Sequence, residues 1–254
     1  MRNILAIAHK ELKSYFASPI AYIVIGFFAL LYGFFFSLIL KAFVGASMQA
    51  AMTGGAQAMN VNQQVIRPVF QNVTVMALFL LPMVTMRTYS EEKRSGTIEL
   101  LLTSPVTDIE IVLGKFLGAM ALYGAMLAIT IVHLGVLFLA GRPEWKPIVT
   151  AYLGFVLFGG CFVSLGLFVS SLSKNQIVAG TVTFAVFLLL WIISWIGSVS
   201  PDMAKLTSYL SIIEHFDDFA KGVIDTSHLI YYVSFIIFGL FLTAKSVESE
   251  RWRG

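Results

Sequence analysis

The residues best suited to chemistry gather in one stretch, residues 87–116, which lies between long apolar segments. Nine of its side chains are charged, and these are Arg87, Glu91, Glu92, Lys93, Arg94, Glu99, Asp108, Glu110 and Lys115. Because charged groups are costly inside a bilayer, this stretch must lie in water. Carboxylates and cations at such close spacing offer ion pairs, which is the chemistry of docking to a soluble partner.

Motifs for catalysis and metal binding are missing from the sequence. There is no GxxxxGK(S/T) phosphate-binding loop, so we expect no ATP hydrolysis by this chain alone. There is no HExxH, CxxC or Gly-x-Ser-x-Gly motif, and the single cysteine, Cys161, can form neither an internal disulfide nor a metal site. We therefore predict no catalytic residue, metal or cofactor here. His133 is interpreted as an interhelical hydrogen-bond donor, with a proton relay as the alternative.

The charged stretch has its own helix start and stop signals. Ser95-Gly96 predicts a break, and Thr97 is a good N-cap for a short helix at residues 98–102. Glu99 would lie at the positive end of that helix, and Pro105 would end it.

A second helix should begin soon after this short one. Thr107 and Glu110 have the Thr-x-x-Glu spacing of a capping box. The short helix is thus held between two long ones at the membrane surface. Its adjacent leucines need a partner, so it either lies on lipid as a connector or docks to another protein.

Composition excludes a soluble globular protein, because 58% of residues are hydrophobic, 12% are charged and the mean hydropathy is +0.85. Apolar runs of about 20 residues match a hydrocarbon core about 30 Å thick. We predict an all-α polytopic membrane protein with six transmembrane helices. Their predicted spans are residues 20–40, 69–86, 116–139, 148–172, 177–196 and 228–244.

Residues 1–18 form an amphipathic pattern ahead of the first span, and Pro19 ends it. The apolar face contains Ile4, Leu5, Ala8, Leu12, Tyr15 and Phe16. We predict an elbow helix lying in the membrane interface; a plain basic flank is the alternative. No cleavable signal peptide is expected, because the apolar run starts only near Ile20 and lacks a cleavage site.

Three further patterns leave alternatives open. Residues 41–64 are either a loop or a helical extension of the first span. Gly114-x-x-x-Gly118 predicts close helix packing at the start of the third span. The many small residues of the fourth span indicate close packing within the chain or a dimer seam.

The distribution of basic residues predicts the orientation. With six spans, 11 Lys and Arg residues fall on one side and 6 on the other. The positive-inside rule then places both termini and residues 87–115 in the cytoplasm, and residues 197–227 outside. This outer loop mixes acidic and apolar residues, which predicts short helices at or dipping into the interface. Because no Asp, Glu, Lys or Arg lies well inside a span, energy for any transport must enter through residues 87–115.

Four segments resemble type-2 ABC transporter permeases. They are residues 10–19 (KELKSYFASP), residues 91–105 (EEKRSGTIELLLTSP), Lys115-Phe116, and residues 209–222 with Tyr209-Leu210-Ser211 and HFDDFAKG. The resemblance covers nearly the whole chain and is strongest to the gliding-motility-type permease subunits. It implies an elbow helix, a cytoplasmic coupling helix that contacts a separate ABC ATPase subunit, and external re-entrant helices before the last span.

The resemblance also implies site residues, partners and a location. The residues that would contact the ATPase are Lys10, Glu11, Glu91, Glu92, Arg94, Gly96, Thr97, Glu99, Leu100 and Leu101. Those of the external loop are Glu214, Phe216, Asp217, Phe219 and Gly222. A second permease, identical or related, and membrane lipid are the other partners, and no nucleic acid is expected. ATP and Mg²⁺ would bind to the partner ATPase, and the complex would lie in the bacterial inner membrane.

Together these features predict the permease subunit of an ABC exporter. The alternative is a non-transporting membrane anchor that uses the same loop to recruit a cytoplasmic machine. An intramembrane enzyme is disfavoured, because the spans contain no catalytic pair. Charge reversal at Glu91, Glu92 or Glu99 is expected to lower transport-coupled ATP hydrolysis.

Overall fold

The computed structural model describes residues 2–53, 60–141, 143–199 and 201–252, and the described chain is helical without strands. Six helices of this part of the chain are long and apolar enough to cross a membrane. They are α2 (Pro19–Met52), α3 (Arg67–Thr85), α6 (Asp108–Ala140), α7 (Trp145–Leu172), α8 (Gln176–Val199) and α11 (Thr226–Arg251). Each predicted span falls on one of them, and the predicted all-α polytopic fold is confirmed.

The helix α2 is much longer than the first predicted span. Its 34 residues correspond to about 51 Å at 1.5 Å per residue, against about 30 Å of hydrocarbon. Residues 41–52 are therefore a helical extension of the span, which decides that alternative for this part of the segment. Residues 54–59 lie outside the described residues. The chain then enters α3 through a π-helical turn, Asn62–Ile66.

The helix α1 (Arg2–Ala17) precedes the spans and packs against α6. A Cβ atom on Gly114 would lie 2.6 Å from the Ile7 side chain, and one on Gly118 would lie 2.7 Å from Glu11 Cβ. The close packing predicted from Gly114-x-x-x-Gly118 therefore joins α1 to α6. The buried face of α1 differs in part from the apolar face predicted for it. Glu11 is buried, whereas Leu5, which was expected on the apolar face, is 65% exposed.

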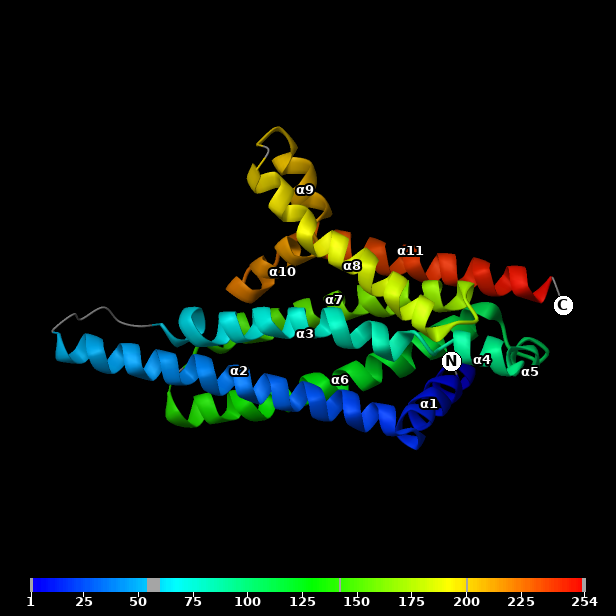
Figure 1. The fold of residues 1–254 in the computed structure, drawn as a ribbon, viewed down its shortest axis with the longest axis horizontal. Helices are drawn as coiled ribbons and strands as arrows, with labels where there is room; N and C mark the ends of the chain where they lie inside the picture. The colour runs from blue at the N-terminus through cyan, green and yellow to red at the C-terminus, as the bar shows by residue number, and fades with distance from the viewer. Residues whose placement is uncertain (1, 54–59, 142, 200, 253–254) are drawn as a thin grey trace.

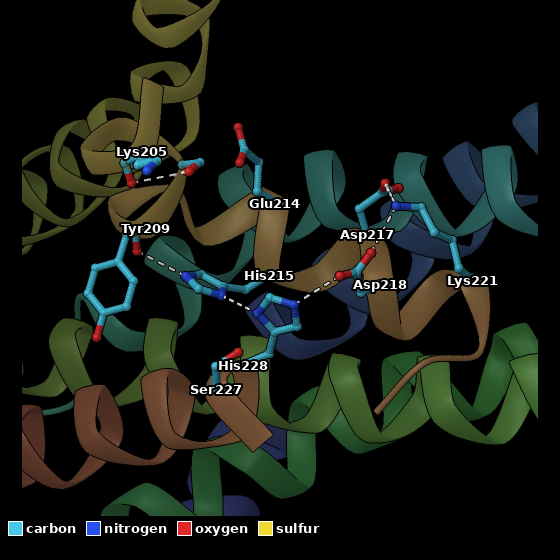
Figure 2. A pocket seen from close by; sticks show the side chains of 10 residues that line it. Lys205, Tyr209, Glu214, His215, Asp217, Asp218, Lys221, Ser227 and His228 are labelled. Carbon is cyan, nitrogen blue, oxygen red and sulfur yellow. Dashed lines mark hydrogen bonds and ion pairs between the residues drawn. The ribbon is translucent and has the colours of Figure 1, made fainter. Parts of the chain in front are cut away.

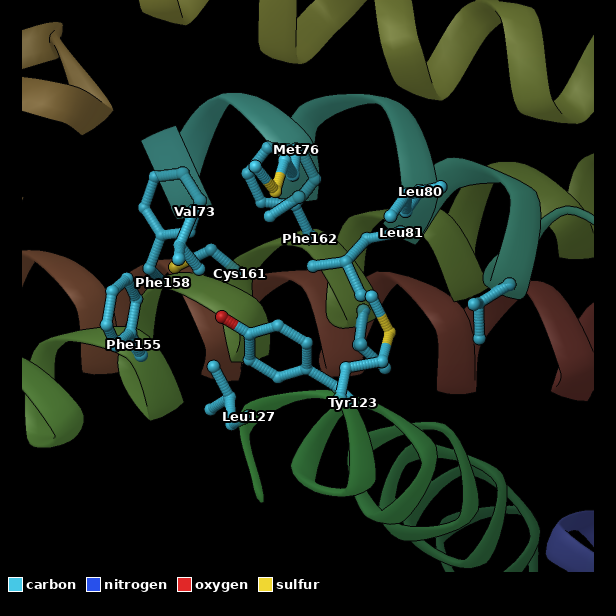
Figure 3. Close-up of a cluster of buried hydrophobic side chains, with 14 of the residues drawn as sticks. Val73, Met76, Leu80, Leu81, Tyr123, Leu127, Phe155, Phe158, Cys161 and Phe162 are labelled. Carbon is cyan, nitrogen blue, oxygen red and sulfur yellow. The ribbon is translucent and has the colours of Figure 1, made fainter. Parts of the chain in front are cut away.

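The helix α7 forms the centre of the bundle. In an apolar stretch of 18 residues from each helix, the buried share is 72% for α7, compared with 22% for α2 and 17% each for α8 and α11. Figure 3 shows Phe155, Phe158 and Phe162 of α7 facing side chains of α3 and α6. Small residues make this possible: a Cβ on Gly159 would lie 2.2 Å from the Tyr123 ring. The small residues of the fourth span thus serve packing within the chain.

The two ends of the bundle carry different short helices (Figure 1). Both termini lie at the end that carries α4 (Ser90–Ser95) and α5 (Ile98–Leu102), which we call the α5 end. The opposite end, the α10 end, carries α10 (Ile212–Lys221) beside the beginnings of α3 and α7. There Asn62 and Glu144 are joined by hydrogen bonds of 2.8 and 2.9 Å. The arrangement agrees with the predicted alternation of the spans.

Candidate functional site

The backbone of the charged stretch follows local rules. Gly96 has a φ of 75°, so the predicted break after α4 is confirmed, and α5 follows as the predicted short helix. The capping box of Thr107 and Glu110 is present, and it starts α6 at Asp108. The predicted Thr97 cap is wrong, because the Thr97 hydroxyl lies 2.9 Å from the Ser95 hydroxyl and caps no backbone amide.

Ser170, near the end of α7, fixes the start of α4. Its hydroxyl accepts hydrogen bonds from the amides of Tyr89 and Ser90, at 3.0 and 3.1 Å. The same hydroxyl donates to the carbonyl of Met86 at 2.9 Å. One small side chain thereby ties the turn between α3 and α4 to the central helix, so α4 cannot move independently of the bundle.

A buried lysine holds α1, α4 and α6 together. Lys115 is completely buried, and its Nζ lies 2.9 Å from Glu11 Oε1 and 2.9 Å from Glu92 Oε2. It also donates to the Thr88 carbonyl at 3.0 Å. Lys10 reaches the same carboxylates from the surface, 3.0 Å from Glu92 and 3.4 Å from Glu11. Two cations and two anions thus balance within this cluster, which we call the Lys115 cluster (Lys10, Glu11, Glu92 and Lys115).

The Lys115 cluster keeps the Glu11 carboxylate ionised. Burial alone would raise the pKa of Glu11, but the ammonium of Lys115 and its hydrogen bond, with help from Lys10, lower that pKa below the ordinary value. A carboxylate with a lowered pKa stabilises the fold above its unfolded-state pKa, and the stabilisation is lost as the pH falls through the folded-state pKa. The contact of α1 with α4 and α6 at the Lys115 cluster should therefore be stable at neutral pH and weaken in acid.

Sequence reasoning missed the role of Lys115, which was counted as a cation of the loop. A signal was present. The capping box already places Lys115 two turns inside a helix. In α1, Glu11 lies three residues after Ala8 and four before Tyr15, on the face that was predicted to be apolar. Two opposite charges on apolar helix faces indicate a buried pair, although not which two helices meet.

The far side of the charged stretch is fixed by the last turn of α11. Glu250 forms an ion pair with the nearly buried Lys93, and Arg251 lies 2.7 Å from Asp108. Arg251 also donates to the Val106 carbonyl at 3.3 Å. The chain on both sides of α5 is therefore anchored to α11, and α5 itself forms the tip of a rigid support.

The tip of this support presents an apolar residue among charges. Ile98 points inward at 9% exposure, whereas Leu100 is 73% exposed. Most residues expected to contact a partner are exposed around it, namely Lys10, Glu91, Arg94, Gly96, Thr97 and Glu99. Leu101 and Glu92 are partly buried, and a cleft of about 330 Å³ lies between α1 and α4. The structure places Glu11 inside the protein, so the expectation that it lies on this surface is corrected.

Replacing Gly118 with leucine should displace α1 from α6, because even a Cβ there would lie 2.7 Å from Glu11 Cβ. We expect a loss of about 1–3 kcal/mol in stability, typical of overpacking. Thermal unfolding and trypsin cleavage after Lys10 and Lys13 would measure it. The control is Gly124→Leu in the same helix, where no atom lies within 4 Å of an added Cβ. Equal stability of the two variants would contradict the packing described.

The residues expected in the external loop lie at the α10 end. Ser211 caps α10, with its hydroxyl 3.5 Å from the Glu214 amide, and Gly222 ends it with a φ of 92°. Phe216 and Phe219 are fully buried against α7, where a Cβ on Gly154 would lie 2.8 Å from Phe219. Glu214 is exposed. The predicted short helices are present as α9 (Ala204–Leu210) and α10, joined to α8 by a 3-10 turn, Pro201–Met203.

Asp217 ties α10 to the beginning of α3. Arg67 Nη2 lies 2.7 Å from Asp217 Oδ2, and Lys221 lies 2.8 Å from the same oxygen. Burial would raise the pKa of Asp217, but the hydrogen bonds from Arg67 and Lys221 outweigh it and lower the pKa. Sequence reasoning placed Asp217 in this loop and did not identify Arg67 as its partner.

Acid should loosen this contact between α10 and α3. The stabilisation exists above the unfolded-state pKa of about 3.9 and is lost as the pH falls through the lower folded-state pKa. Because both side chains are about one-third exposed, we expect only about 1 kcal/mol. Unfolding between about pH 5 and 3 would show it. Asp217→Asn should remove this component, and an unchanged pH dependence would contradict the assignment.

Comparison with known proteins gives one family. The sequence model of the ABC-2 family transporter proteins matches residues 5–247, which include α5, the Lys115 cluster and α10. No curated protein matches the chain.

Proposed function

We propose that this chain, which belongs to the ABC-2 family of transporter proteins, is the permease subunit of an ABC-type exporter. In this proposal a separate cytoplasmic ATPase binds ATP and Mg²⁺ and hydrolyses the ATP, and this chain converts the resulting motion into movement of a substrate across the bacterial inner membrane. Its membership of the family and its six apolar helices make it a multi-pass membrane component.

The observation that carries the proposal is the exposed tip of α5 on a support joined to the spans. Leu100 is 73% exposed, whereas Lys115 behind it is fully buried. A push on α5 reaches α6 through the capping box of Thr107, and it reaches α7 through α4 and Ser170. Packed cores transmit such displacements because they are nearly incompressible. The geometry therefore suits a lever between a soluble subunit and the bundle.

The surface around Leu100 has the chemistry of a protein contact. An apolar residue among charged groups is a common arrangement at interfaces, where a buried centre is surrounded by a polar rim. In our proposal Leu100 inserts into a hollow of the ATPase, and Glu91, Arg94 and Glu99 pair with charges at its edge. Lys10 extends this contact to α1, the proposed elbow helix.

The proposed orientation and assembly follow from the same arrangement. The α5 end carries the larger share of Lys and Arg, which supports a cytoplasmic location for it and for both termini. The α10 end then faces outward, with α9 and α10 as the proposed re-entrant helices. The small buried share of α2 and α8 leaves surfaces for a second permease, identical or related, as well as for lipid.

The alternative function, a membrane anchor without transport, uses the same docking surface. A distance measurement separates the two. Spin labels would be attached to cysteines replacing Met48 and Trp145, which are 62% and 61% exposed on α2 and α7. With the ATPase copurified from membranes, a permease should change this distance when ATP binds to a hydrolysis-deficient ATPase. A distance that stays constant in a complex that binds ATP would support the anchor.

A further inference from the structure

A polar cleft of about 520 Å³ lies between α9, α10 and the beginning of α11 (Figure 2). Within it two imidazoles meet directly, with His215 Nδ1 2.6 Å from His228 Nδ1. His215 is on α10, and His228 is in the first turn of α11. Each imidazole makes one further hydrogen bond through its other ring nitrogen. His215 Nε2 lies 2.9 Å from the Tyr209 carbonyl at the end of α9, and His228 Nε2 lies 2.9 Å from Asp218 Oδ2.

The partners at the two ends fix the protons along this chain of groups. A carbonyl oxygen only accepts, so His215 Nε2 must carry hydrogen. The contact between the two Nδ1 atoms needs one hydrogen, so one ring donates it and the other presents a bare nitrogen. An ionised carboxylate also only accepts, so His228 Nε2 must carry hydrogen as well. All three hydrogen bonds therefore exist together only when the pair carries one proton more than two neutral rings, so that one of the two rings is an imidazolium.

The surroundings favour His215 as the neutral ring of the pair and keep Asp218 ionised. The hydrogen bond from Lys221, with a further one from His228, lowers the pKa of Asp218 despite its partial burial, so Asp218 remains a carboxylate. Burial lowers the pKa of His215, which favours its neutral form. The other charged groups that line the cleft are Lys205 of α9 and Glu214, Asp217 and Lys221 of α10. Arg67 of α3 pairs with Asp217, and Asp225 caps the start of α11.

We infer that His215 and His228 form a proton-binding site in which one proton fastens α10 to the end of α9 and the first turn of α11. Without this proton, His228 has a single N–H for two acceptors. If it donates to Asp218, two nitrogen lone pairs face each other; if it donates to His215, a lone pair faces the carboxylate. Either way one hydrogen bond of the chain is lost and a repulsive contact replaces it.

The site should respond between about pH 5 and 8, the range in which imidazoles titrate. The chain of hydrogen bonds is complete on the acidic side of this range and loses one bond on the basic side. Protonation of Asp218, whose pKa is lowered by Lys221 and His228, would interrupt it again only in stronger acid. Because Phe216 and Phe219 stay buried against α7, loss of the proton loosens α10 rather than releasing it. The outward location of the site rests on the proposed function; proton binding itself does not.

Nuclear magnetic resonance of the histidine ring nitrogens tests the site directly. The chain has four histidines, so ¹⁵N-histidine labelling of the purified protein in detergent micelles gives few signals. At about pH 5.5 we expect one neutral ring with a bare Nδ1, one fully protonated ring, and a scalar coupling across the N–H···N bond. At about pH 8 this coupling should disappear. Two rings that titrate independently of each other, or no coupling at any pH, would overturn the inference.

Hydrogen exchange supplies the mechanical readout. Protection factors of the α10 amides should fall about tenfold from about pH 5.5 to about pH 8, because one charge-assisted hydrogen bond is lost. His228→Gln should remove this dependence, whereas His9→Gln should keep it. An unchanged protection profile in the wild-type protein would contradict the fastening role. Both measurements use the permease alone, so they remain decisive even if no ATPase partner is found.

Discussion

Replacing Lys115 with alanine is expected to lower the free energy of unfolding by about 3–5 kcal/mol, the cost of removing one partner from a buried ion pair. The substitution would leave Glu11 and Glu92 facing each other with only the surface residue Lys10 between them and solvent. The Glu11 side chain is just 9% exposed, so water would replace the ammonium of Lys115 poorly. Unfolding in mixed detergent, monitored through the loss of helical signal, would measure this effect.

A second variant separates the charge from the packing at this position. Lys115→Met combined with Glu11→Gln and Glu92→Gln removes both anions together with the cation and should recover much of the loss, since uncharged replacements avoid unpaired buried charges. The control is Lys245→Ala, whose ion pair with Glu248 is exposed and should contribute less than about 1 kcal/mol. If Lys115→Ala were as stable as Lys245→Ala, the Lys115 cluster would not hold α1 in place.

Replacing Leu100 with aspartate should sharply reduce the stimulation of ATP hydrolysis by the assembled complex. We expect Leu100 to be a hot spot of this contact. Changing a hot-spot residue costs about 2 kcal/mol or more, so binding of the ATPase should weaken about 30-fold or more. The fold should survive, because Leu100 is 73% exposed and supports little of the core. ATP hydrolysis by the reconstituted complex and titration of the ATPase onto the permease would measure both effects.

The matched control for Leu100 is Leu172→Asp, which changes a leucine of 62% exposure at the end of α7. It should leave the affinity for the ATPase close to that of the wild type. Charge reversal at Glu91 and Glu99 tests the rim of the same contact. Glu92 no longer suits that test, because its reversal would also break the ion pair with Lys115. Equal losses in Leu100→Asp and Leu172→Asp would argue against a specific role for α5.

Features set by neighbouring residues could be predicted from the sequence. The apolar runs gave the six crossing helices, because a segment in lipid must satisfy its own backbone hydrogen bonds. Gly96 marked a position that requires a positive φ, and Thr107 with Glu110 marked the start of α6. The Thr97 hydroxyl caps no amide, because the Thr97 backbone is helical (φ −73°, ψ −11°) and not extended as an N-cap requires.

Features that depend on distant parts of the chain could not be predicted. Lys115 and Glu11 are 104 positions apart, and Arg67 and Asp217 are 150 apart. The first pair exists because α1 packs against α6, and the second because α10 and α3 both pack against α7. The contact between His215 and His228 is closer in sequence, at 13 positions, but depends on the turn that Gly222 makes between α10 and α11. The residue pattern of a single helix does not show which other helix it will contact.

Crosslinking from residue 100 tests the central claim most directly, that a soluble ATPase drives this chain through α5. The native Cys161 is buried, so Leu100→Cys introduces the accessible thiol, and Met52→Cys, at 87% exposure on the far end of α2, is the matched site on the other side. In right-side-out membrane vesicles, a thiol reagent that cannot cross the membrane should label position 52 and spare position 100. A bifunctional crosslinker should join position 100 to the ATPase. Labelling of position 100 from outside, or crosslinks from it to lipid alone, would contradict the account.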